Sequence, residues 1–232
     1  MWQVVQRGVE ALFYPPFCGM CKQGLGSTEH VICTPCQLSL PETRFHVQQN
    51  HAMWYALNAQ TEVHHATAWL YFGQKNEIRD FIHQMKYRQG KNLAFWAGQT
   101  YGFTLAACAP WSAADVLIPM PMYWRKFYSR GFNQAEVFAQ GLSKSLGLPV
   151  WTDVVRKNRP TQSQTKQGRT SRMENVRDTL EVVKPEKIHG KTCLIVDDVM
   201  TTGATCIALA QRLNDAGAKA VLVCCLATAQ RD

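Results

Sequence analysis

Two continuous apolar runs near the C-terminal end of the chain, residues 193–196 and 221–227, constrain the fold more than any other feature. Strands buried on both faces of a parallel sheet have such uninterrupted runs, whereas half-exposed strands alternate apolar and polar residues. Residues 204–216, between the two runs, form a predicted helix that Gly217 would end. A strand, a helix and a second strand in this order predict an α/β fold, with a parallel sheet flanked by helices.

The same alternation of strands and helices extends upstream. From residue 65 onward we expect strands at residues 66–72 and 116–118, and helices at residues 76–87, 91–108 and 134–146. Asn133 and Glu136 fit a capping box at the start of the last of these helices. Residues 2–13 place their apolar side chains close to one helical face, and the following prolines would stop that helix.

Composition limits the function classes. The chain has 232 residues, of which 46% are hydrophobic and 18% charged, so a buried core is expected and global disorder is excluded. The formal net charge of +8 favours a polyanionic ligand, either a phosphate compound or nucleic acid. Residues 1–13 contain Arg7 and Glu10 and lack the apolar core of a secretory signal, and we expect a cytoplasmic protein with no membrane span.

Four of the nine cysteines have metal-ligand spacing. Cys18 and Cys21 form one Cys-x-x-Cys pair, and Cys33 and Cys36 form a second pair after eleven intervening residues. Two such turns provide four thiolates for a tetrahedral structural zinc ion, Zn²⁺. A redox Cys-x-x-Cys pair and unpaired thiols are the alternatives, and the doubled spacing favours zinc. The other five cysteines lie in apolar stretches and are expected to be small buried hydrophobes.

The strongest functional signal follows the first apolar run. Two adjacent carboxylates come directly after that predicted strand, and a small hydroxyl-rich turn then opens the helix; the residues are Asp197, Asp198, Thr201, Thr202, Gly203, Ala204 and Thr205. Ligands of parallel sheets bind at the carboxyl ends of strands, and a helix N-terminus suits a phosphate. The acids would repel phosphate but can accept hydrogen bonds from the hydroxyls of a sugar. The pattern therefore indicates a ribose 5-phosphate site, with a merely solvated acid pair as the alternative.

A long basic segment is the second functional candidate. Residues 156–177 contain seven lysines and arginines against one acid, together with many polar residues. Polar loops of this length inside a compact domain are usually functional or disordered.

These residues resemble known families. Residues 194–205 resemble the phosphoribosyl-pyrophosphate signature of type I phosphoribosyltransferases: an apolar strand, two acids and a Thr/Gly turn. The segments 118–121 (Ile-Pro-Met-Pro) and 130–134 (Arg-Gly-Phe-Asn-Gln), with Arg125 and Lys126 between them, resemble the ComF family (competence protein F, ComFC/GntX-like). The four-cysteine ribbon and residues 82–87 are similar to that family too, so the resemblance covers nearly the whole chain.

The resemblance implies two domains: a helix plus zinc ribbon at residues 1–44, and a phosphoribosyltransferase-like domain at residues 45–232 with a flexible basic loop at 156–177. It implies that phosphoribosyl pyrophosphate binds together with magnesium, Mg²⁺. Asp197 and Asp198 would hold the ribose diol, and the turn from Thr201 through Thr202, Gly203 and Ala204 to Thr205 would bind the 5-phosphate. The turn after Ile118 would face the leaving pyrophosphate, with Arg125, Lys126 or Arg130 nearby; Asp197, Asp198 and Arg130 are the predicted catalytic residues.

Pentosyl transfer, a glycosyltransferase reaction, would then be the activity, and its acceptor is not readable from the sequence. Purine-salvage members of the family often have an acid where this chain has Thr201, so 6-oxopurine salvage is disfavoured. The N-terminal half would select the acceptor; its aromatic residues are either core or acceptor platform, and they are Trp54, Tyr55, Trp69, Tyr71 and Trp96.

A second function class stays open beside the enzyme. ComF relatives serve DNA uptake and natural transformation at the cytoplasmic side of the membrane. The chain could therefore be a non-catalytic module that binds single-stranded DNA, or a regulatory competence protein, that retains the phosphoribosyl pocket. The implied partners are single-stranded DNA and DNA-uptake or recombination proteins, with the protein held at the inner face of the membrane through them.

Overall fold

The structure is a computed structural model that describes residues 17–73, 76–85, 90–158 and 179–229. The helix expected at residues 2–13 and most of the basic loop, residues 159–178, lie outside the described residues.

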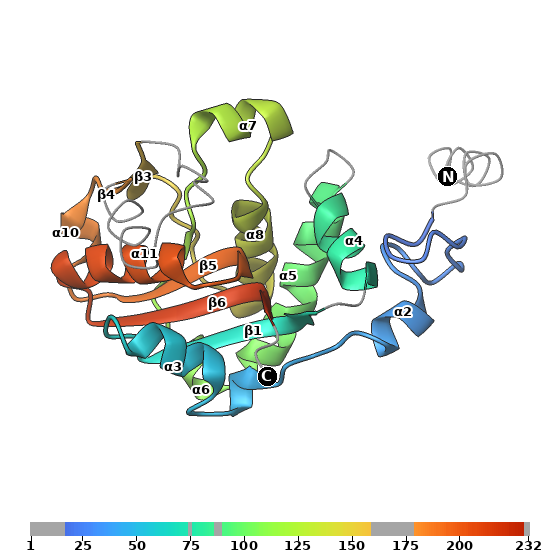
Figure 1. The fold of residues 1–232 in the computed structure, drawn as a ribbon, viewed down its shortest axis with the longest axis horizontal. Coiled ribbons are helices and arrows are strands. Elements are labelled where there is room, and N and C mark those ends of the chain that lie inside the picture. The colour runs from blue at the N-terminus through green and yellow to red at the C-terminus, as the bar shows by residue number, and fades with distance from the viewer. Residues whose placement is uncertain (1–16, 74–75, 86–89, 159–178, 230–232) are drawn as a thin grey trace, which may run out of the picture.

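A four-stranded parallel sheet forms the centre of the molecule (Figure 1). Its strands lie in the order β1–β6–β5–β2, and they are β1 (His65–Phe72), β6 (Ala220–Ala229), β5 (Thr192–Met200) and β2 (Val116–Pro119). A separate antiparallel pair is formed by β3 (Val155–Lys157) and β4 (Leu180–Val182). The predicted α/β class with a parallel sheet is confirmed.

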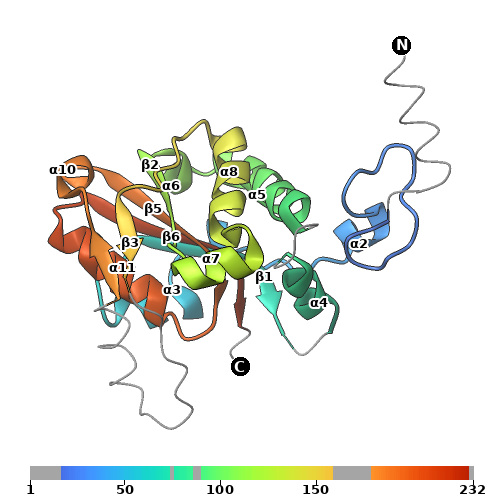
Figure 2. The ribbon, with the colours of Figure 1, turned by 90° about the horizontal axis from the view of Figure 1, so that it is seen from above.

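Helices cover both faces of the sheet (Figure 2). One face packs against α4 (Asn76–Gln84), α5 (Gly90–Ala106) and α8 (Gln134–Leu146), and the other against α3 (Ala52–Asn58) and α11 (Ala204–Asp215). The shorter helices are α2 (Thr34–Leu38), η1 (Phe45–Val47), α6 (Ala109–Ser112), α7 (Trp124–Arg130) and α10 (Pro185–Ile188). In β5, Leu194 contacts the first core and Ile195 the second, which is why the apolar run has no polar gaps.

Helices α5 and α8 approach each other unusually closely because glycines face one another. A Cβ atom on Gly98 would lie 2.1 Å from the carbonyl oxygen of Phe138, and one on Gly141 would lie 2.2 Å from that of Phe95. Side chains at these two positions would push the helices apart, so the glycines fix the backbone that carries the N-terminus of α8 toward the sheet edge.

The cysteine-rich segment shares the first core. Cys18 and Ile32 are buried in the same hydrophobic cluster as Ile78 of α4 and Leu93 of α5. The chain then runs along the edge of the sheet, where the Thr43 amide donates to the Trp69 carbonyl of β1. The division into residues 1–44 and 45–232 stays a prediction.

Most long elements and the short strand β2 agree with the sequence expectations, whereas the other short elements were not predicted. Helix α8 has the expected bounds, and Asn133 caps it, but its side chain accepts from the amide of Ala135 and not from that of Glu136. Strand β5 extends through both aspartates to Met200, whereas we expected it to end before them. Arg156 and Lys157, expected in the basic loop, lie in β3. Among the described helices, none has the length and apolar character needed to cross a bilayer.

Candidate functional site

A cavity of about 290 Å³ lies where the carboxyl ends of β2 and β5 meet the N-termini of α8 and α11. Its walls combine acidic, basic, hydroxyl and apolar side chains from segments that are far apart in the sequence; they are Met120, Pro121, Met122, Tyr123, Lys126, Arg130, Asn133, Gln134, Ala135, Lys157, Asp197, Asp198, Val199, Thr201 and Thr205. This is the sheet edge at which parallel α/β folds bind ligands.

Asp197 is the most buried acid of the site, with 7% of its surface exposed. Its side chain accepts hydrogen bonds from the Asp198 amide at 2.9 Å and from the Thr205 hydroxyl at 3.4 Å. Burial, and then the charge of Asp198, raise the pKa of the Asp197 carboxyl well above its usual range. A carboxyl held in this way is destabilised as an anion until a ligand supplies hydrogen-bond donors or positive charge.

Asp198 lines the same cavity although neighbouring strand residues normally face opposite sides. The alternation of faces is broken at this residue. Val199 packs with the core cluster of Leu194, whereas Asp197 contacts Cys206 of α11 on the other face. Asp198 also has no paired residue in the register between β5 and β6, in which Asp197 pairs with Cys225 and Val199 with Ala227. The local irregularity brings both carboxylates to one ligand-sized space.

The turn after β5 is built around Gly203. This residue has φ +85° and caps α11, and a Cβ atom there would lie 2.8 Å from the Met200 side chain and 3.1 Å from that of Leu57. The Thr202 hydroxyl accepts from the Ala204 amide at 3.4 Å. The amides at the start of this 12-residue helix point toward the turn, as a phosphate-binding helix N-terminus requires.

Three cationic side chains face the acids: Lys126 and Arg130 from α7, and Lys157 from β3. Burial, and then the charge of Lys126, lower the pKa of Lys157, while Asp197 acts in the opposite direction. Arg130 donates to the Gln134 side-chain oxygen at 3.1 Å. The Nε2 of Gln134 is buried and has no hydrogen-bond partner among the described residues, so a donor is available on this wall.

A second, larger cavity of about 850 Å³ adjoins the first and shares Pro121, Met122, Asn133 and Lys157 with it. Helix α7, which stands away from the sheet in Figure 1, contributes three aromatic side chains to its wall. Trp124 is 53% exposed and Tyr128 79% exposed, and no residue of the helix is buried. Large exposed aromatic groups that gather beside a cavity commonly mark a binding surface.

The four predicted zinc ligands lie together. The Sγ atoms of Cys18, Cys21, Cys33 and Cys36 are all within 4.8 Å of one another. A tetrahedral site with Zn–S bonds of about 2.3 Å requires S–S separations of about 3.8 Å, so the cluster fits this ion. Burial opposes ionisation of Cys18, but amide donors led by that of Cys33 outweigh it and lower the pKa of the thiol to about 6.

The predicted site residues converge only in part. Asp197, Asp198, Thr201, Thr205 and Arg130 line one cavity, and Thr202, Gly203 and Ala204 complete the turn between its two threonines. Arg125 is not among the lining residues and lies over the Trp124 ring at 5.2 Å. The sequence did not predict that Lys157 and Gln134 line this cavity, although Gln134 belongs to the Arg-Gly-Phe-Asn-Gln segment that resembles the ComF family.

The N-terminal aromatic residues lie elsewhere. Trp69 is buried in the core, and none of the five lines the cavity around Asp197. Trp54 lines a different pocket, which lies at the amino end of β1. The aromatic side chains next to the cavity come from residues 123–128 instead.

Comparison with known proteins adds a family context. Residues 133–232 match the family model of the phosphoribosyl transferase domain. The DNA utilization protein YhgH from Escherichia coli K12 is 27% identical over 243 residues, which cover 93% of this chain and 98% of that protein. Competence protein F from Haemophilus influenzae is 32% identical over 117 residues, covering 50% of this chain and 51% of the relative.

Among solved structures, the glutamine phosphoribosylpyrophosphate amidotransferase from B. subtilis, complexed with ADP and GMP, is 25% identical with a TM-score of 0.41. That match covers 60% of this chain and 27% of the amidotransferase chain.

Proposed function

Because the chain belongs to the ComF/YhgH family of competence and DNA-utilization proteins with a phosphoribosyltransferase domain, we propose that its cavity around Asp197 binds phosphoribosyl pyrophosphate with magnesium and transfers the phosphoribosyl group. One observation carries the proposal: two carboxylates, a threonine turn at a helix N-terminus and three cationic side chains line the same cavity. A phosphorylated pentose with a second anionic group needs each of these three elements.

Each element has a separate task. The carboxylates of Asp197 and Asp198 accept hydrogen bonds from the two ribose hydroxyls, and the turn from Thr201 to Thr205 donates amides and hydroxyls to the 5-phosphate. Lys126, Arg130 and Lys157, which line the same cavity, would pair with the pyrophosphate. The oxygen donors of the aspartates are the ligand type that magnesium prefers, and magnesium bound with the substrate supplies charge neutralisation on the leaving group.

In the transfer step, the bond between the anomeric carbon and the pyrophosphate oxygen breaks, and the pyrophosphate leaves with the electron pair. The cations stabilise the negative charge that develops on it, and the carboxylates stabilise the electron-poor ribose. An acceptor nucleophile then forms the new bond at the anomeric carbon. The adjoining cavity along α7 is the available route for that acceptor, since the two cavities share a wall.

Calorimetric titration tests the proposal. Phosphoribosyl pyrophosphate is titrated into the protein with and without magnesium, in the wild type and in Asp197→Asn/Asp198→Asn. We expect micromolar binding in the wild type, about −8 kcal/mol, and none in the double variant. Asp80→Asn, which changes an exposed carboxylate on α4, is the matched control. A flat wild-type trace would remove the enzyme proposal.

The four-cysteine cluster is proposed to hold a structural zinc ion with no catalytic role, because four thiolates leave no open coordination position. Metal analysis should find one zinc ion per chain. Cys33→Ser should cause aggregation or loss of soluble protein, whereas Cys108→Ser, at a half-buried cysteine outside the cluster, should not. A carefully purified sample without metal would contradict the assignment.

A second candidate function, single-stranded DNA binding, is favoured by the composition of α7. Along this helix the aromatic side chains of Trp124, Phe127 and Tyr128 alternate with Arg125, Lys126 and Arg130, and five of these six residues are exposed. Proteins that bind single strands combine stacking platforms with cationic grooves in this way. Partners in DNA uptake or recombination, and a place at the inner face of the membrane through them, belong to the same proposal.

Fluorescence anisotropy with a labelled oligothymidylate separates the two functions. If DNA binds along α7, affinity falls steeply with salt and Trp124→Ala/Tyr128→Ala abolishes it, while Asp197→Asn leaves it intact. Phe103→Ala removes an equally exposed aromatic ring from α5 and serves as the control. Equal affinity in the α7 and control variants would exclude this surface.

A further inference from the structure

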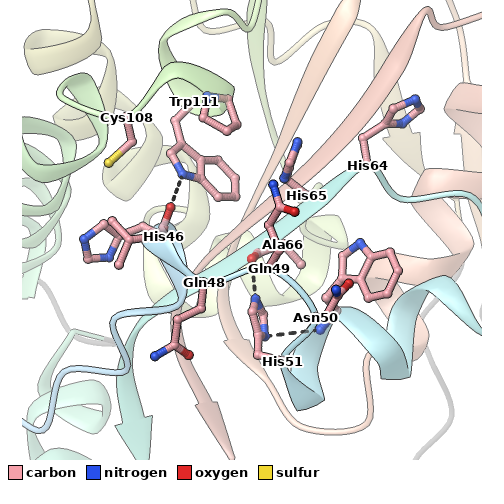
Figure 3. A pocket seen from close by; sticks show the side chains of 13 residues that line it. His46, Gln48, Gln49, Asn50, His51, His64, His65, Ala66, Cys108 and Trp111 are labelled. Atoms are coloured by element: carbon pink, nitrogen blue, oxygen red, sulfur yellow. Dashed lines mark hydrogen bonds between the residues drawn. The ribbon is translucent and has the colours of Figure 1, made fainter.

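A third cavity, of about 370 Å³, lies at the amino end of β1, the opposite sheet edge from Asp197 (Figure 3). It is formed where residues 46–51 and the start of α3 meet the first residues of β1 and the region of α6. Its volume falls in the lower part of the range of about 300–1,000 Å³ that small-molecule sites occupy. None of its lining residues belongs to the proposed phosphoribosyl site.

The two indole rings in its wall are held in place by the protein. The Trp111 Nε1 donates to the His46 carbonyl at 3.0 Å, and the Trp54 Nε1 donates to the Val63 carbonyl at 2.9 Å. Trp111 is only 1% exposed, so of the two it is the half-buried Trp54 that can present its ring to a ligand.

The polar side chains in the wall are, by contrast, largely without partners. Gln48, Gln49, Asn50 and His65 make no side-chain hydrogen bond to any residue that the structure describes, and they come from two separate segments. In Figure 3 the side chains of Gln49 and His65 lie in the middle of the pocket, below Trp111. Asn50 has φ +63°, in the left-handed region. The pocket thus presents several neutral donors and acceptors.

The described lining has no permanently charged side chain to balance an ionic ligand. The described lining residues include no lysine, arginine, aspartate or glutamate. Burial lowers the pKa of His46, His51 and His65, which keeps these imidazoles neutral near pH 7. His51 is fixed as the neutral form, since its Nε2 donates to the Ala66 carbonyl at 2.8 Å and its Nδ1 accepts from the Trp54 amide at 3.4 Å. A phosphate or carboxylate would find no lysine or arginine in the described lining, and the fourth histidine, His64, already has its Nε2 3.7 Å from Glu62 Oε1.

We propose that this pocket binds an uncharged nucleobase or nucleoside. Flat heterocycles stack on aromatic rings, and asparagine and glutamine amides pair with the donor and acceptor edges of bases, adenine above all. The lining of the half-buried Trp54 indole, three amides and neutral imidazoles matches that chemistry. The site is distinct from the proposed phosphoribosyl cavity, so its ligand would be an effector or a second substrate and not phosphoribosyl pyrophosphate.

Saturation-transfer NMR and calorimetry with adenosine, guanosine, cytidine and uridine test the proposal, with AMP as the charged comparator. We expect at least one nucleoside to bind, adenosine most tightly, and AMP to bind at least tenfold more weakly. Gln49→Ala/Asn50→Gly should weaken nucleoside binding at least tenfold, and glycine accepts the φ of Asn50 without strain. Gln140→Ala, at an exposed glutamine of α8, should have no effect.

Two results would overturn the inference. The first is the absence of binding of all four nucleosides by the wild type at millimolar concentration. The second is nucleoside binding that Gln49→Ala/Asn50→Gly leaves unchanged, in particular if Trp124→Ala/Tyr128→Ala removes it, because the ligand would then occupy the cavity beside α7. Neither result depends on whether phosphoribosyl pyrophosphate binds, since all titrations are made without it.

Discussion

The two ends of the parallel strands, the carboxyl edge and the amino edge of the sheet, differ in charge. The cavity at the carboxyl edge is lined by two aspartates, two lysines and an arginine, whereas the described lining of the pocket at the amino edge contains amides, imidazoles and indoles. Helix α11 connects the two regions, since its N-terminus follows the Gly203 turn and Asn214, near its C-terminus, donates to the carbonyl of Glu62, two residues before His64 of the amino-edge pocket. A helix places positive potential at its N-terminus, so α11 favours an anion at the carboxyl edge.

Charge removal at the carboxyl edge should have the largest effect. In Arg130→Gln/Lys157→Gln, two charge-assisted hydrogen bonds to the pyrophosphate group are lost, each worth about 1.5–3 kcal/mol. Affinity for magnesium pyrophosphate, measured by calorimetry, should fall by at least about a hundredfold, and adenosine binding at the other edge should not change. Lys144→Gln, on the exposed face of α8, is the control. Equal losses for both ligands would show that the two regions do not bind independently.

Gly203→Ala should have the next largest effect, and it acts on the turn alone. The new Cβ would meet Met200 and Leu57 at a φ of +85°, and a left-handed non-glycine residue by itself costs about 1–3 kcal/mol. Gly147→Ala isolates that backbone cost, because Gly147 has φ +71° and nothing within 4 Å of the added atom. We expect Gly203→Ala to reduce both the free energy of unfolding and the affinity for phosphoribosyl pyrophosphate, and Gly147→Ala to reduce only the former. Equal ligand affinity in the two variants would refute the role of the turn.

The buried Asp197 carboxyl should lower the free energy of unfolding at high pH, although the proposed ligand needs it. Its raised pKa means that the folded state retains a proton that the unfolded chain has released, so this carboxyl contributes less stability as the pH rises through the folded-state pKa. Asp197→Asn should therefore raise the free energy of unfolding by about 0.5–2 kcal/mol at pH 8 and have little effect near pH 4. Chemical denaturation at both pH values measures this, with Asp80→Asn as the exposed control. A destabilised Asn variant at pH 8 would contradict the account.

Salt concentration should give the smallest difference in binding between the two sites. Between about 0.05 M and about 0.5 M salt, screening should weaken phosphoribosyl pyrophosphate binding several-fold, because the ligand and the Lys126–Arg130 wall are charged. Nucleoside binding at the amino edge should change less than twofold. A matching salt dependence for both ligands would indicate that they share one charged site.

The sequence predicted the elements whose own residue pattern shows which of their faces are buried. Strands β5 and β6 are buried on both faces and therefore have uninterrupted apolar runs, and α8 combines a clear apolar stripe with Asn133 as its cap. Helix α7 was missed because its apolar residues face solvent and not a core, so no amphipathic pattern marks it. Its aromatic residues are informative only once the fold places them beside the cavity.

The sequence predicted most of the residues of the candidate site around Asp197, but not how they are arranged in space. The Asp-Asp and Thr-Gly pattern predicted the turn, but the broken alternation at Asp198 depends on how β5 packs between the two cores, which sequence spacing does not encode. Lys157 was assigned to a loop because the pairing of the three-residue strands β3 and β4 is a tertiary event. The amino-edge pocket had no sequence signal, since its amides and histidines come from segments that only the fold brings together.

A crystal structure of the protein with phosphoribosyl pyrophosphate and magnesium tests the central claim most directly. The account predicts 5-phosphate oxygens within about 3 Å of the amides of residues 202–205, with both ribose hydroxyls on the Asp197 and Asp198 carboxylates. Density for the ligand at any other place, or a ribose that leaves both aspartates uncontacted, would contradict it.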